Sequence, residues 1–386
     1  MILHEPAGLR VGVIGCGYWG PKHLRVFEAM PTVRSVVAID ARPEQLVNVR
    51  RALPSALTFS TLDEALPHVD ALVIATPPST HFALASQAIA AGKHVLVEKP
   101  MTTTAASAQQ LVARAAEAGT VLMAGHTFEY NPAVVQLRDI VQEELGRIYY
   151  VHSARLNLGL YQDDVSVIFD LAPHDVSILN FLLDSEPTSV QAWGSRHAHP
   201  RHADVAYLRL DYGERGVCSN IHVSWLDPCK VRRVTVVGSR KMAVYDDLSN
   251  DERIRVFDKG VSPASLGDVT TQPPMSYRYG DIVAPYTPSD EPLGVQDEHF
   301  VDCVLNGTAP RSDGVVGMRV VRVLEAAQRS LDEGKVVELD HPDATTTFTG
   351  KQMDAARVTA ASGHATNGGA LGVLDREPVG THRGGQ

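Results

Sequence analysis

A short apolar run near the start of the chain leads directly into a spaced set of glycines. The run is Leu9–Ile14, and Gly15, Gly17 and Gly20 follow it in the pattern Gly-x-Gly-x-x-Gly. In a strand–loop–helix unit the first glycine permits a tight turn, the second lets a pyrophosphate approach the backbone, and the third lets helix and strand pack closely. The amino end of the helix then faces the phosphates. The pattern therefore predicts a dinucleotide-binding βαβ unit.

Two charged residues after the second apolar run bear on which dinucleotide is bound. Asp40 lies 20 residues after Gly20, where a carboxylate can accept hydrogen bonds from ribose hydroxyls and repel a 2′-phosphate. Asp40 could instead cap the next helix, and Arg42 could pair with a 2′-phosphate. We expect NAD to be favoured over NADP. Tyr18 and Trp19, inside the glycine loop, are assigned to the same cofactor site.

The glycine loop belongs to a longer alternation of apolar runs and amphipathic segments. Several runs are nearly continuous in apolar residues, which is typical of parallel strands covered by helices on both faces. Helical patterns such as Thr80–Ala91 and Ala105–Ala118 separate them, so the alternation predicts an α/β, doubly wound Rossmann domain. The expected strands are Leu9–Ile14, Val33–Ile39, Leu57–Ser60, Ala71–Ala75, His94–Val97 and Val121–Ala124.

The pattern changes after the sixth run. A helix is expected over Ala133–Leu145, a strand over Ile148–Leu156, and another helix near Val167–Leu183. Strand patterns dominate residues 189–256, which is typical of an open, mainly antiparallel sheet carrying helices on one face. The second part of the chain is therefore predicted to be an α+β domain.

The remaining segments set the expected domain limits. Residues 260–292 are rich in Pro, Ser and Asp and are expected to form a long loop. After residue 340 there are few large apolar residues, so this tail is expected to be disordered. We predict a Rossmann domain over residues 1–126, a substrate-binding and oligomerisation domain over 127–340, and a tail over 341–386.

The composition excludes several classes of protein. The 386 residues carry a net charge of -10, from 35 basic and 45 acidic residues. This argues against nucleic acid or an acidic membrane as a partner, because such binding needs clustered Lys and Arg. The four cysteines form no Cys-x-x-Cys pair. No apolar run reaches the length of about 18 residues that a membrane span needs, and the start of the chain does not look like a signal peptide. A cytoplasmic location is expected.

Three residues are candidates for chemistry beside the first sheet. Lys99 follows the fifth expected strand, and ligands of open parallel sheets bind outside the carboxyl ends of strands. Asp170 and His174 are four residues apart, so on a helix they share a face. A histidine beside a carboxylate can transfer protons. Considered singly, the lysine could be a solvated loop residue and the pair a surface helix contact.

Taken together, these motifs resemble the Gfo/Idh/MocA oxidoreductases over nearly all of residues 9–340. The resemblance rests on the glycine loop, on Thr76–His81, on the Glu-Lys-Pro element around Lys99, and on the pair formed by Asp170 and His174. It implies hydride transfer at a secondary alcohol or its ketone, with the last three side chains converging on the reacting group. It also implies a homodimer or homotetramer.

The resemblance suggests a role for each of these residues. His174 is the first choice for the proton carrier, Lys99 would polarise the carbonyl oxygen and hold the developing alkoxide, and Asp170 would orient them. The roles of His174 and Lys99 could be exchanged. Glu98 and Thr76 are expected near the nicotinamide half of the cofactor. The cofactor residues predicted in this region are Thr76, Pro77, His81, Glu98 and Lys99.

Three further stretches are similar to the nucleotide-sugar 3-dehydrogenases, which oxidise the C3 hydroxyl of UDP-N-acetylglucosamine derivatives. They are Gly125–Pro132, Arg155–Gly159 and Gly280–Pro285. Four side chains from two of these stretches are therefore assigned to the substrate: Tyr130, Asn131, Arg155 and Asn157. An inositol or free-sugar dehydrogenase, a glycoside hydrolase or lyase that uses NAD transiently, and a non-catalytic NAD-binding regulator remain alternatives.

No metal site is predicted. His197, His199 and His202 form a His-x-His-x-x-His string between two strand patterns, where an exposed loop is the expected structure. Hydride transfer between a dinucleotide and an alcohol needs no metal.

Overall fold

The computed structural model describes residues 8–339 apart from Leu160, Asp163, His199, 214–215 and 264–274. The predicted tail at 341–386 lies outside the described residues. The domain limits at residues 126 and 340 stay predictions.

Six strands near the amino terminus form one parallel sheet. They are β1 (Leu9–Ile14), β2 (Val33–Ile39), β3 (Leu57–Phe59), β4 (Ala71–Ile74), β5 (His94–Glu98) and β6 (Leu122–Gly125). Their order across the sheet is β3-β2-β1-β4-β5-β6, which confirms the predicted Rossmann sheet. The order reverses between β1 and β4, and a ligand crevice forms outside the carboxyl ends of strands at such a switch point.

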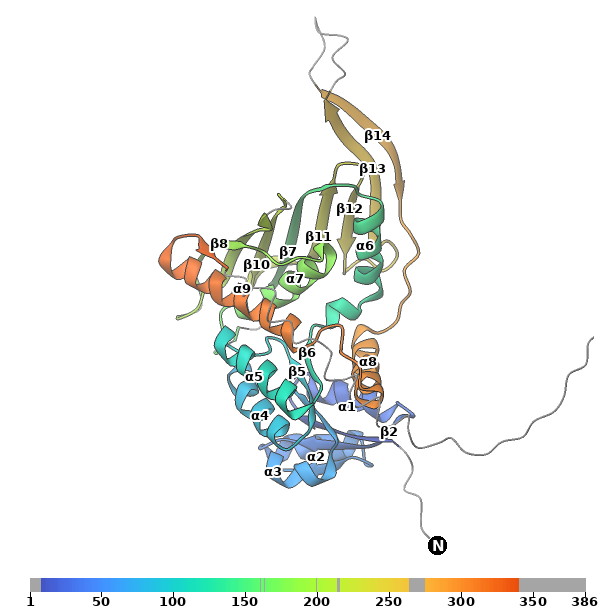
Figure 1. Ribbon diagram of the computed structural model, residues 1–386, viewed down its shortest axis with the longest axis vertical. Helices are drawn as coiled ribbons and strands as arrows, with labels where there is room; N and C mark the ends of the chain where they lie inside the picture. The colour runs from blue at the N-terminus through green and yellow to red at the C-terminus, as the bar shows by residue number, and fades with distance from the viewer. Residues whose placement is uncertain are drawn as a thin grey trace, which may run out of the picture. The chain divides into compact units, whose positions relative to one another are not determined.

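Helices cover both faces of this sheet (Figure 1). They include α1 (Gly20–Glu28), α2 (Pro43–Ala52), α3 (Leu62–Ala65), α4 (Pro78–Ala90) and α5 (Ala105–Ala118). Alternate strand residues enter two separate apolar clusters, because successive side chains of a strand point to opposite faces. Leu72 and Ile74 belong to the cluster that holds residues of α4 and α5. Val73 belongs to the other, with Leu24 of α1 and Phe300 of a later helix.

Nine strands form a second, mixed sheet. They are β7 (Ile148–Leu158), β8 (Ser189–Ser195), β9 (Val205–Asp211), β10 (Cys218–Ser224), β11 (Leu226–Gly238), β12 (Met242–Asp246), β13 (Ile254–Pro263), β14 (Met275–Val283) and β15 (Val337–Glu338). The order is β14-β13-β12-β11-β7-β10-β9-β8-β15. Among the described strands of this sheet, only the β7–β10 pair is parallel, so the predicted open, mainly antiparallel sheet is confirmed.

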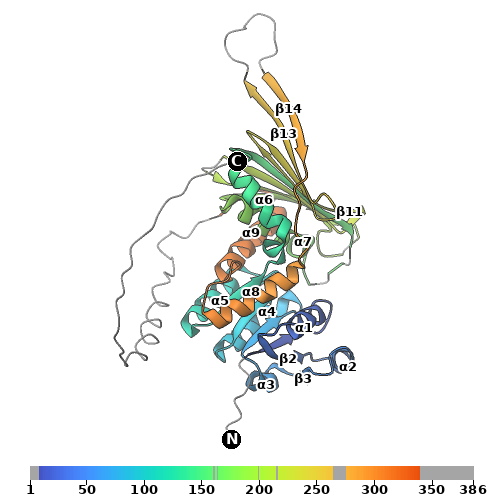
Figure 2. The ribbon, with the colours of Figure 1, turned by 90° about the vertical axis from the view of Figure 1, so that its right-hand side faces the viewer.

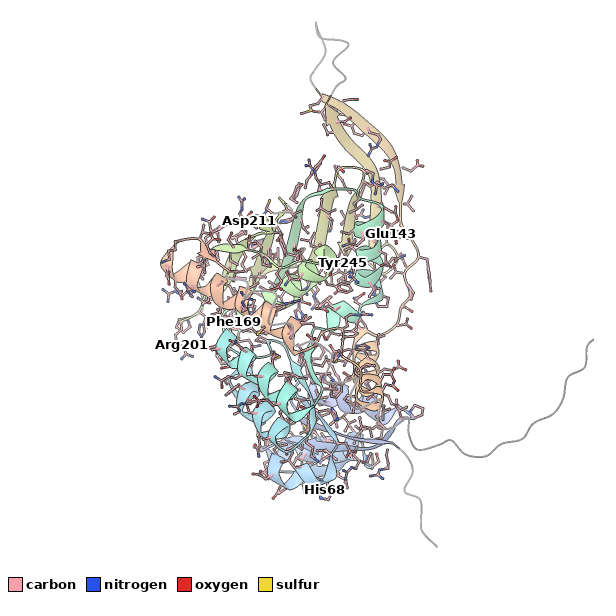
Figure 3. All side chains as sticks on the ribbon, viewed as in Figure 1. His68, Glu143, Phe169, Arg201, Asp211 and Tyr245 are labelled. Atoms are coloured by element: carbon pink, nitrogen blue, oxygen red, sulfur yellow. The ribbon has the colours of Figure 1, made fainter. Side chains whose placement is uncertain are left out.

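Three helices lie on one face of this second sheet (Figures 1 and 2). They are α6 (Pro132–Glu143), α7 (Val167–Leu183) and α9 (Gly314–Glu333). Their apolar residues form one buried cluster with the strands, and Tyr245 of β12 lies in this layer (Figure 3). The amino end of α9 also reaches the first sheet, where Asp313 bridges Met123 of β6 and the Ser312 carbonyl accepts the amide of Ala124.

Two elements differ from the sequence prediction. The expected loop at 260–292 contains β14, which pairs with β13 over a long antiparallel ladder. Every residue of β14 is exposed, so the strand has no buried face and no alternating pattern to reveal it. Helix α8 (Pro292–Asn306) was not predicted either, and it packs against α1.

None of the helices in the described part of the chain is both long enough and apolar enough to span a membrane.

Candidate active site

The three glycines of the loop meet three different steric demands. Gly15 has φ of 95°, and a Cβ there would lie 2.6 Å from the carbonyl oxygen of Ala75. A Cβ on Gly20 would overlap the carbonyl oxygen of Gly15. A Cβ on Gly17 would have only Arg42 Nη2 within 4 Å, at 3.8 Å. The space next to Gly17 is therefore open, as the close approach of a pyrophosphate to the backbone requires.

Asp40 stands directly after β2 and faces the glycine loop. Its Oδ2 accepts the amide of Cys16 at 2.7 Å, and its Oδ1 accepts the amide of Arg42 at 2.9 Å. The guanidinium of Arg42 also donates to both oxygens, at 3.2 and 3.3 Å. Burial opposes the charge, but these donors lower the pKa of Asp40 overall. Asp40 is therefore an ionised acceptor fixed at the edge of the loop.

The aromatic residues inside the loop point outward. Tyr18 is 74% exposed and Trp19 is 37% exposed. The Nζ of Lys22, in the first turn of α1, lies 3.7 Å from the centroid of the Tyr18 ring and 4.3 Å from that of Trp19. Both rings are thus placed at the surface beside the loop.

His81 ties two predicted cofactor segments together. Its ring nitrogens face the carbonyl oxygens of Thr76 at 2.8 Å and Pro100 at 2.9 Å, and the side chain is fully buried. Both nitrogens contact the backbone, so His81 joins the ends of β4 and β5, and its contact with the cofactor stays a prediction. Pro77, which immediately precedes α4, lies in the first of these segments.

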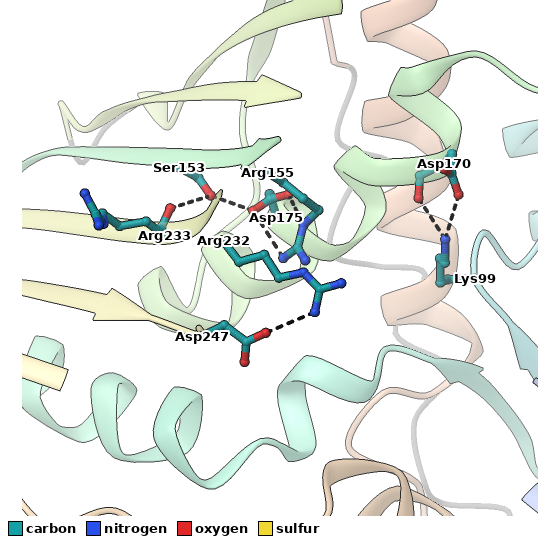
Figure 4. Close-up of polar contacts among 8 residues, drawn as sticks. All are labelled: Lys99, Ser153, Arg155, Asp170, Asp175, Arg232, Arg233 and Asp247. Atoms are coloured by element: carbon teal, nitrogen blue, oxygen red, sulfur yellow. Dashed lines mark hydrogen bonds and ion pairs between the residues drawn. The ribbon is translucent and has the colours of Figure 1, made fainter. Parts of the chain in front are cut away.

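Lys99 and Asp170 meet between the two sheets (Figure 4). Lys99 follows β5, and its Nζ donates to the main-chain oxygen of Asp170 at 2.8 Å and to Oδ1 at 3.2 Å. Asp170 lies in the first turn of α7, and its Oδ2 accepts the indole N–H of the buried Trp225 at 2.9 Å. The structure therefore brings together two of the three predicted catalytic side chains and adds a donor that fixes the carboxylate.

His174 lies one turn further along α7, as the four-residue spacing predicts. Its ring contacts Phe128 edge-on, with 5.1 Å between the ring centroids. Within the described residues, Nδ1 is buried and has no hydrogen-bond partner. Burial, with the nearby charges of Lys99 and Arg155, moves the pKa of His174 well below its usual range. The ring is therefore neutral at physiological pH and can accept a proton.

Two arginine–aspartate pairs lie side by side (Figure 4), and the charges of both arginines contribute to the lowered pKa of His174. Arg155 of β7 donates from Nε to Asp175 at 2.7 Å, and its guanidinium lies 4.5 Å from the centroid of the Phe128 ring. Arg232 of β11 is its register partner and donates to Asp247 at 3.2 Å. Adjacent like charges on a sheet repel unless each has a counterion, and the two aspartates supply them.

The other predicted substrate residues have different surroundings. The buried hydroxyl of Tyr130 lies 3.0 Å from Ser312 Oγ, and the ring belongs to the apolar cluster against the first sheet. Asn131 caps α6 through the amide of Ala133, and its Nδ2 donates to the hydroxyl of Tyr245 at 3.2 Å. In this structure their polar atoms contact the protein itself, and the contacts of Tyr130 and Asn131 with a substrate stay predictions.

Asn157 remains a candidate for substrate contact. It follows Arg155 by two positions on β7, so both side chains project from the same face of the sheet. Its amide lies next to Gly159, near the edge of the Trp225 ring.

Glu98 belongs to a buried charge cluster that spans three elements. His23 of α1 lies 3.2 Å from Glu98 Oε1 through Nε2 and 2.8 Å from Asp297 Oδ2 of α8 through Nδ1. Burial opposes a charge on His23, but the two carboxylates raise its pKa to about 10. A protonated His23 therefore donates to both acids and fixes Glu98, whose Oε2 also accepts the amide of Lys99 at 3.2 Å.

Four of these residues were not identified from the sequence: His23, Trp225, Arg232 and Asp297. A cluster of like charges in one strand pattern can indicate a binding site for an anion. The cluster that contains Arg232 is formed by Lys230, Arg232 and Arg233. Trp225 was readable only as a packing residue. Nothing in the sequence links His23 with Asp297, 274 positions away.

Comparisons with known proteins agree with this geometry. Residues 9–126 match the profile of the Gfo/Idh/MocA oxidoreductase family, described as an NAD-binding Rossmann fold. Residues 134–244 match the C-terminal domain of the same family.

Individual relatives extend the similarity along the chain. The UDP-N-acetylglucosamine 3-dehydrogenase of Acidithiobacillus ferrooxidans is 30% identical over 314 residues, which cover 81% of this chain and 94% of that protein. Its solved structure superposes with a TM-score of 0.69 at 28% identity, covering 84% of this chain and 98% of that one. An inositol 2-dehydrogenase of Acidiphilium cryptum is 33% identical over 213 residues, covering 53% of this chain and 63% of that protein.

A second solved structure carries the cofactor. The GenD2 protein of gentamicin A biosynthesis, in complex with NAD, superposes with a TM-score of 0.73 at 27% identity, covering 88% of this chain and 98% of that one. The two family profiles and the Acidithiobacillus ferrooxidans enzyme, which aligns over most of the chain, lead to the same assignment. This chain belongs to the Gfo/Idh/MocA oxidoreductases, and it is an NAD(P)-dependent dehydrogenase or reductase that acts on CH–OH groups.

Proposed function

We propose that the protein transfers a hydride between NAD and a secondary hydroxyl of a sugar, at C3 of a nucleotide sugar such as a UDP-N-acetylglucosamine derivative. The observation that carries this proposal is the contact between Lys99 Nζ and Asp170, one helical turn from His174. The contact lies at the carboxyl end of β5, the edge of the first sheet where a dinucleotide is expected.

Each polar group has a defined part in the oxidation. Neutral His174 accepts the proton of the substrate hydroxyl. Bound NAD would supply the acceptor for the hydride of the carbon that bears this hydroxyl. The Lys99 ammonium stabilises the alkoxide that develops. Asp170 holds Lys99 in place and is itself held by Trp225. The product is a ketone, and reduction runs through the same groups in reverse.

The environment of Asp40 supports NAD over NADP. Its carboxylate lies against the loop, ionised, where a 2′-phosphate would meet a negative charge. Arg42 is paired with Asp40, so its positive charge is already partly neutralised.

We expect Asp40→Ala to weaken NAD binding and to narrow the preference for NAD over NADP. The substitution removes a ribose acceptor and a repulsive charge, and it releases Arg42. Calorimetric titration of both dinucleotides measures the change, with Arg42→Ala as the matched control that keeps the carboxylate. Tighter binding of NADP than of NAD by the wild type would show that Arg42 governs the pocket and that the assignment of NAD is wrong.

The charges around the glycine loop favour a phosphorylated substrate. The pKa of Tyr18 is lowered by its hydrogen bond and charge contact with Lys22, and to a smaller extent by Arg232 and Lys230. Lys22 belongs to α1, next to the expected pyrophosphate of the cofactor, whereas Lys230 and Arg232 come from β11 of the second sheet. Lys230 can meet a phosphate of a nucleotide sugar, and Arg232, although it is paired with Asp247, adds a second positive charge on the same strand. A neutral inositol has no charge that complements them.

A substrate panel tests this proposal. With NAD present, we expect kcat/KM for UDP-N-acetylglucosamine or its uronic acid to exceed that for myo-inositol and glucose, measured by formation of NADH. A higher kcat/KM for myo-inositol would support the second candidate function, an inositol dehydrogenase. The similarity to the inositol 2-dehydrogenase favours this alternative. Release of free sugar without net NADH would identify a hydrolase or lyase instead.

The outer face of the second sheet supports a homo-oligomer. The rings of Trp193, Tyr207 and His222 stack across three strands, with centroids 5.6 and 4.1 Å apart, and Trp193 is 52% exposed. Exposed apolar patches of this kind commonly mark association surfaces. Light scattering that gives the mass of a monomer for the wild type would contradict the proposed dimer or tetramer.

A further inference from the structure

His126 is a buried polar side chain that the mechanism above does not use. It directly follows β6 and is 1% exposed. Both of its ring nitrogens are buried, and neither has a hydrogen-bond partner among the described residues. The other buried histidines of this region differ: His23 and His81 each have both nitrogens engaged.

The unpaired ring nitrogens of His126 lower the stability of the unliganded protein. Burial lowers the pKa of His126 to about 4, against an upward effect of the Glu98 charge. The ring is therefore neutral, with one N–H donor and one lone pair. A buried donor or acceptor without a partner destabilises a protein, whereas an apolar ring of the same shape would not. A ligand that bonds to the ring would remove this cost.

The position of His126 indicates which ligand. The register pair of Glu98 with Gly125 puts His126 beside Lys99, at the carboxyl ends of the neighbouring strands β5 and β6. The charge of Glu98 raises the pKa of His126 and that of Lys99 lowers it, while His126 contributes to the lowered pKa of His174. His126 thus lies at the carboxyl end of the first sheet, where the cofactor is expected, beside Lys99.

We propose that one ring nitrogen of His126 hydrogen-bonds the carboxamide of the bound nicotinamide and thereby sets the orientation of the ring that exchanges the hydride. The carboxamide has both a donor and an acceptor, so it fits either tautomer of the imidazole. The inference rests on the proposed placement of the nicotinamide half beside Glu98. It makes His126 a determinant of cofactor binding.

Calorimetry with two ligands tests the inference. ADP-ribose has all of NAD except the nicotinamide, so it reports on the rest of the site. For His126→Phe we expect NAD affinity to fall about threefold to tenfold, the range of one hydrogen bond, and ADP-ribose affinity to stay unchanged. His126→Gln, which keeps a donor and an acceptor, should recover part of the loss. The unliganded Phe variant should melt no lower than the wild type, because the unpaired nitrogens are gone.

Several outcomes would overturn the inference. Equal losses of NAD and ADP-ribose affinity would show a structural role for His126. Unchanged NAD affinity, with or without a raised KM for the nucleotide sugar, would show that the ring does not bind the carboxamide. Failure of the wild type to bind NAD at all would instead contradict the proposed cofactor, so the two failures are distinguishable.

Discussion

Lys99→Met and His174→Asn are each expected to slow hydride transfer by about 10²–10⁴-fold, the usual contribution of a positioned acid, base or charge. Lys99→Met keeps most of the length of the side chain but removes the ammonium that contacts Asp170. His174→Asn removes the proton acceptor. Neither residue belongs to the glycine loop, so the affinity for NAD should change little.

Single-turnover formation of NADH separates these effects from product release. Lys93→Met is the matched control. Lys93 immediately precedes β5, whereas Lys99 follows the opposite, carboxyl end of the same strand. That variant should react at the wild-type rate. Full single-turnover rates in both Lys99→Met and His174→Asn would remove these residues from the chemistry.

The pH dependence assigns the proton. His174 binds its proton only at acid pH, since burial and the charge of Lys99 hold its pKa well below the usual value. The kcat/KM for oxidation should therefore rise from acid pH and be level before neutrality, because deprotonated His174 is the active form. The Asn variant should lose this rise. If only Lys99→Met loses it, the lysine carries the proton and the two roles are exchanged.

Gly17→Ala and Gly20→Ala are expected to fail in different ways. A Cβ added at Gly20 would overlap the backbone oxygen of Gly15, and backbone atoms cannot swing aside. We expect Gly20→Ala to lose about 1–3 kcal/mol of stability, as overpacking of a tight core does. At Gly17 the Cβ would meet only the end of the flexible Arg42 side chain. Gly17→Ala should therefore fold normally but lose NAD affinity on the order of tenfold or more, since the pyrophosphate can no longer approach.

Thermal unfolding of the unliganded variants and titration with NAD distinguish the two cases. A Gly17→Ala protein that binds NAD as tightly as the wild type would show that the pyrophosphate does not lie on this loop.

Local patterns carried the parts of the fold that were predictable. Three features could be predicted because each depends on only one or two neighbouring elements. They are the glycine spacing, the buried strands and the four-residue spacing of Asp170 and His174. Strand β14 shows the limit of such patterns. It is held by its pairing with β13 and buries no face, so its composition resembles that of a loop.

The site was less predictable because it depends on contacts between distant segments. The buried chain of Glu98, His23 and Asp297 joins β5, α1 and α8, and no single segment reveals it. Tyr130 and Asn131 show that a motif beside the site does not by itself identify the partners of its side chains. They stand in a motif next to the site, but their polar groups are bound to Ser312 and Tyr245.

The central claim is that a sugar hydroxyl delivers its hydride to NAD in this site. Its most direct test is a single turnover of UDP-N-acetylglucosamine that carries deuterium at C3, with NAD bound. We predict slower formation of the reduced cofactor than with the unlabelled sugar, and recovery of the deuterium on its nicotinamide ring. Deuterium that stays in a released free sugar, with no net reduced cofactor, would contradict the claim.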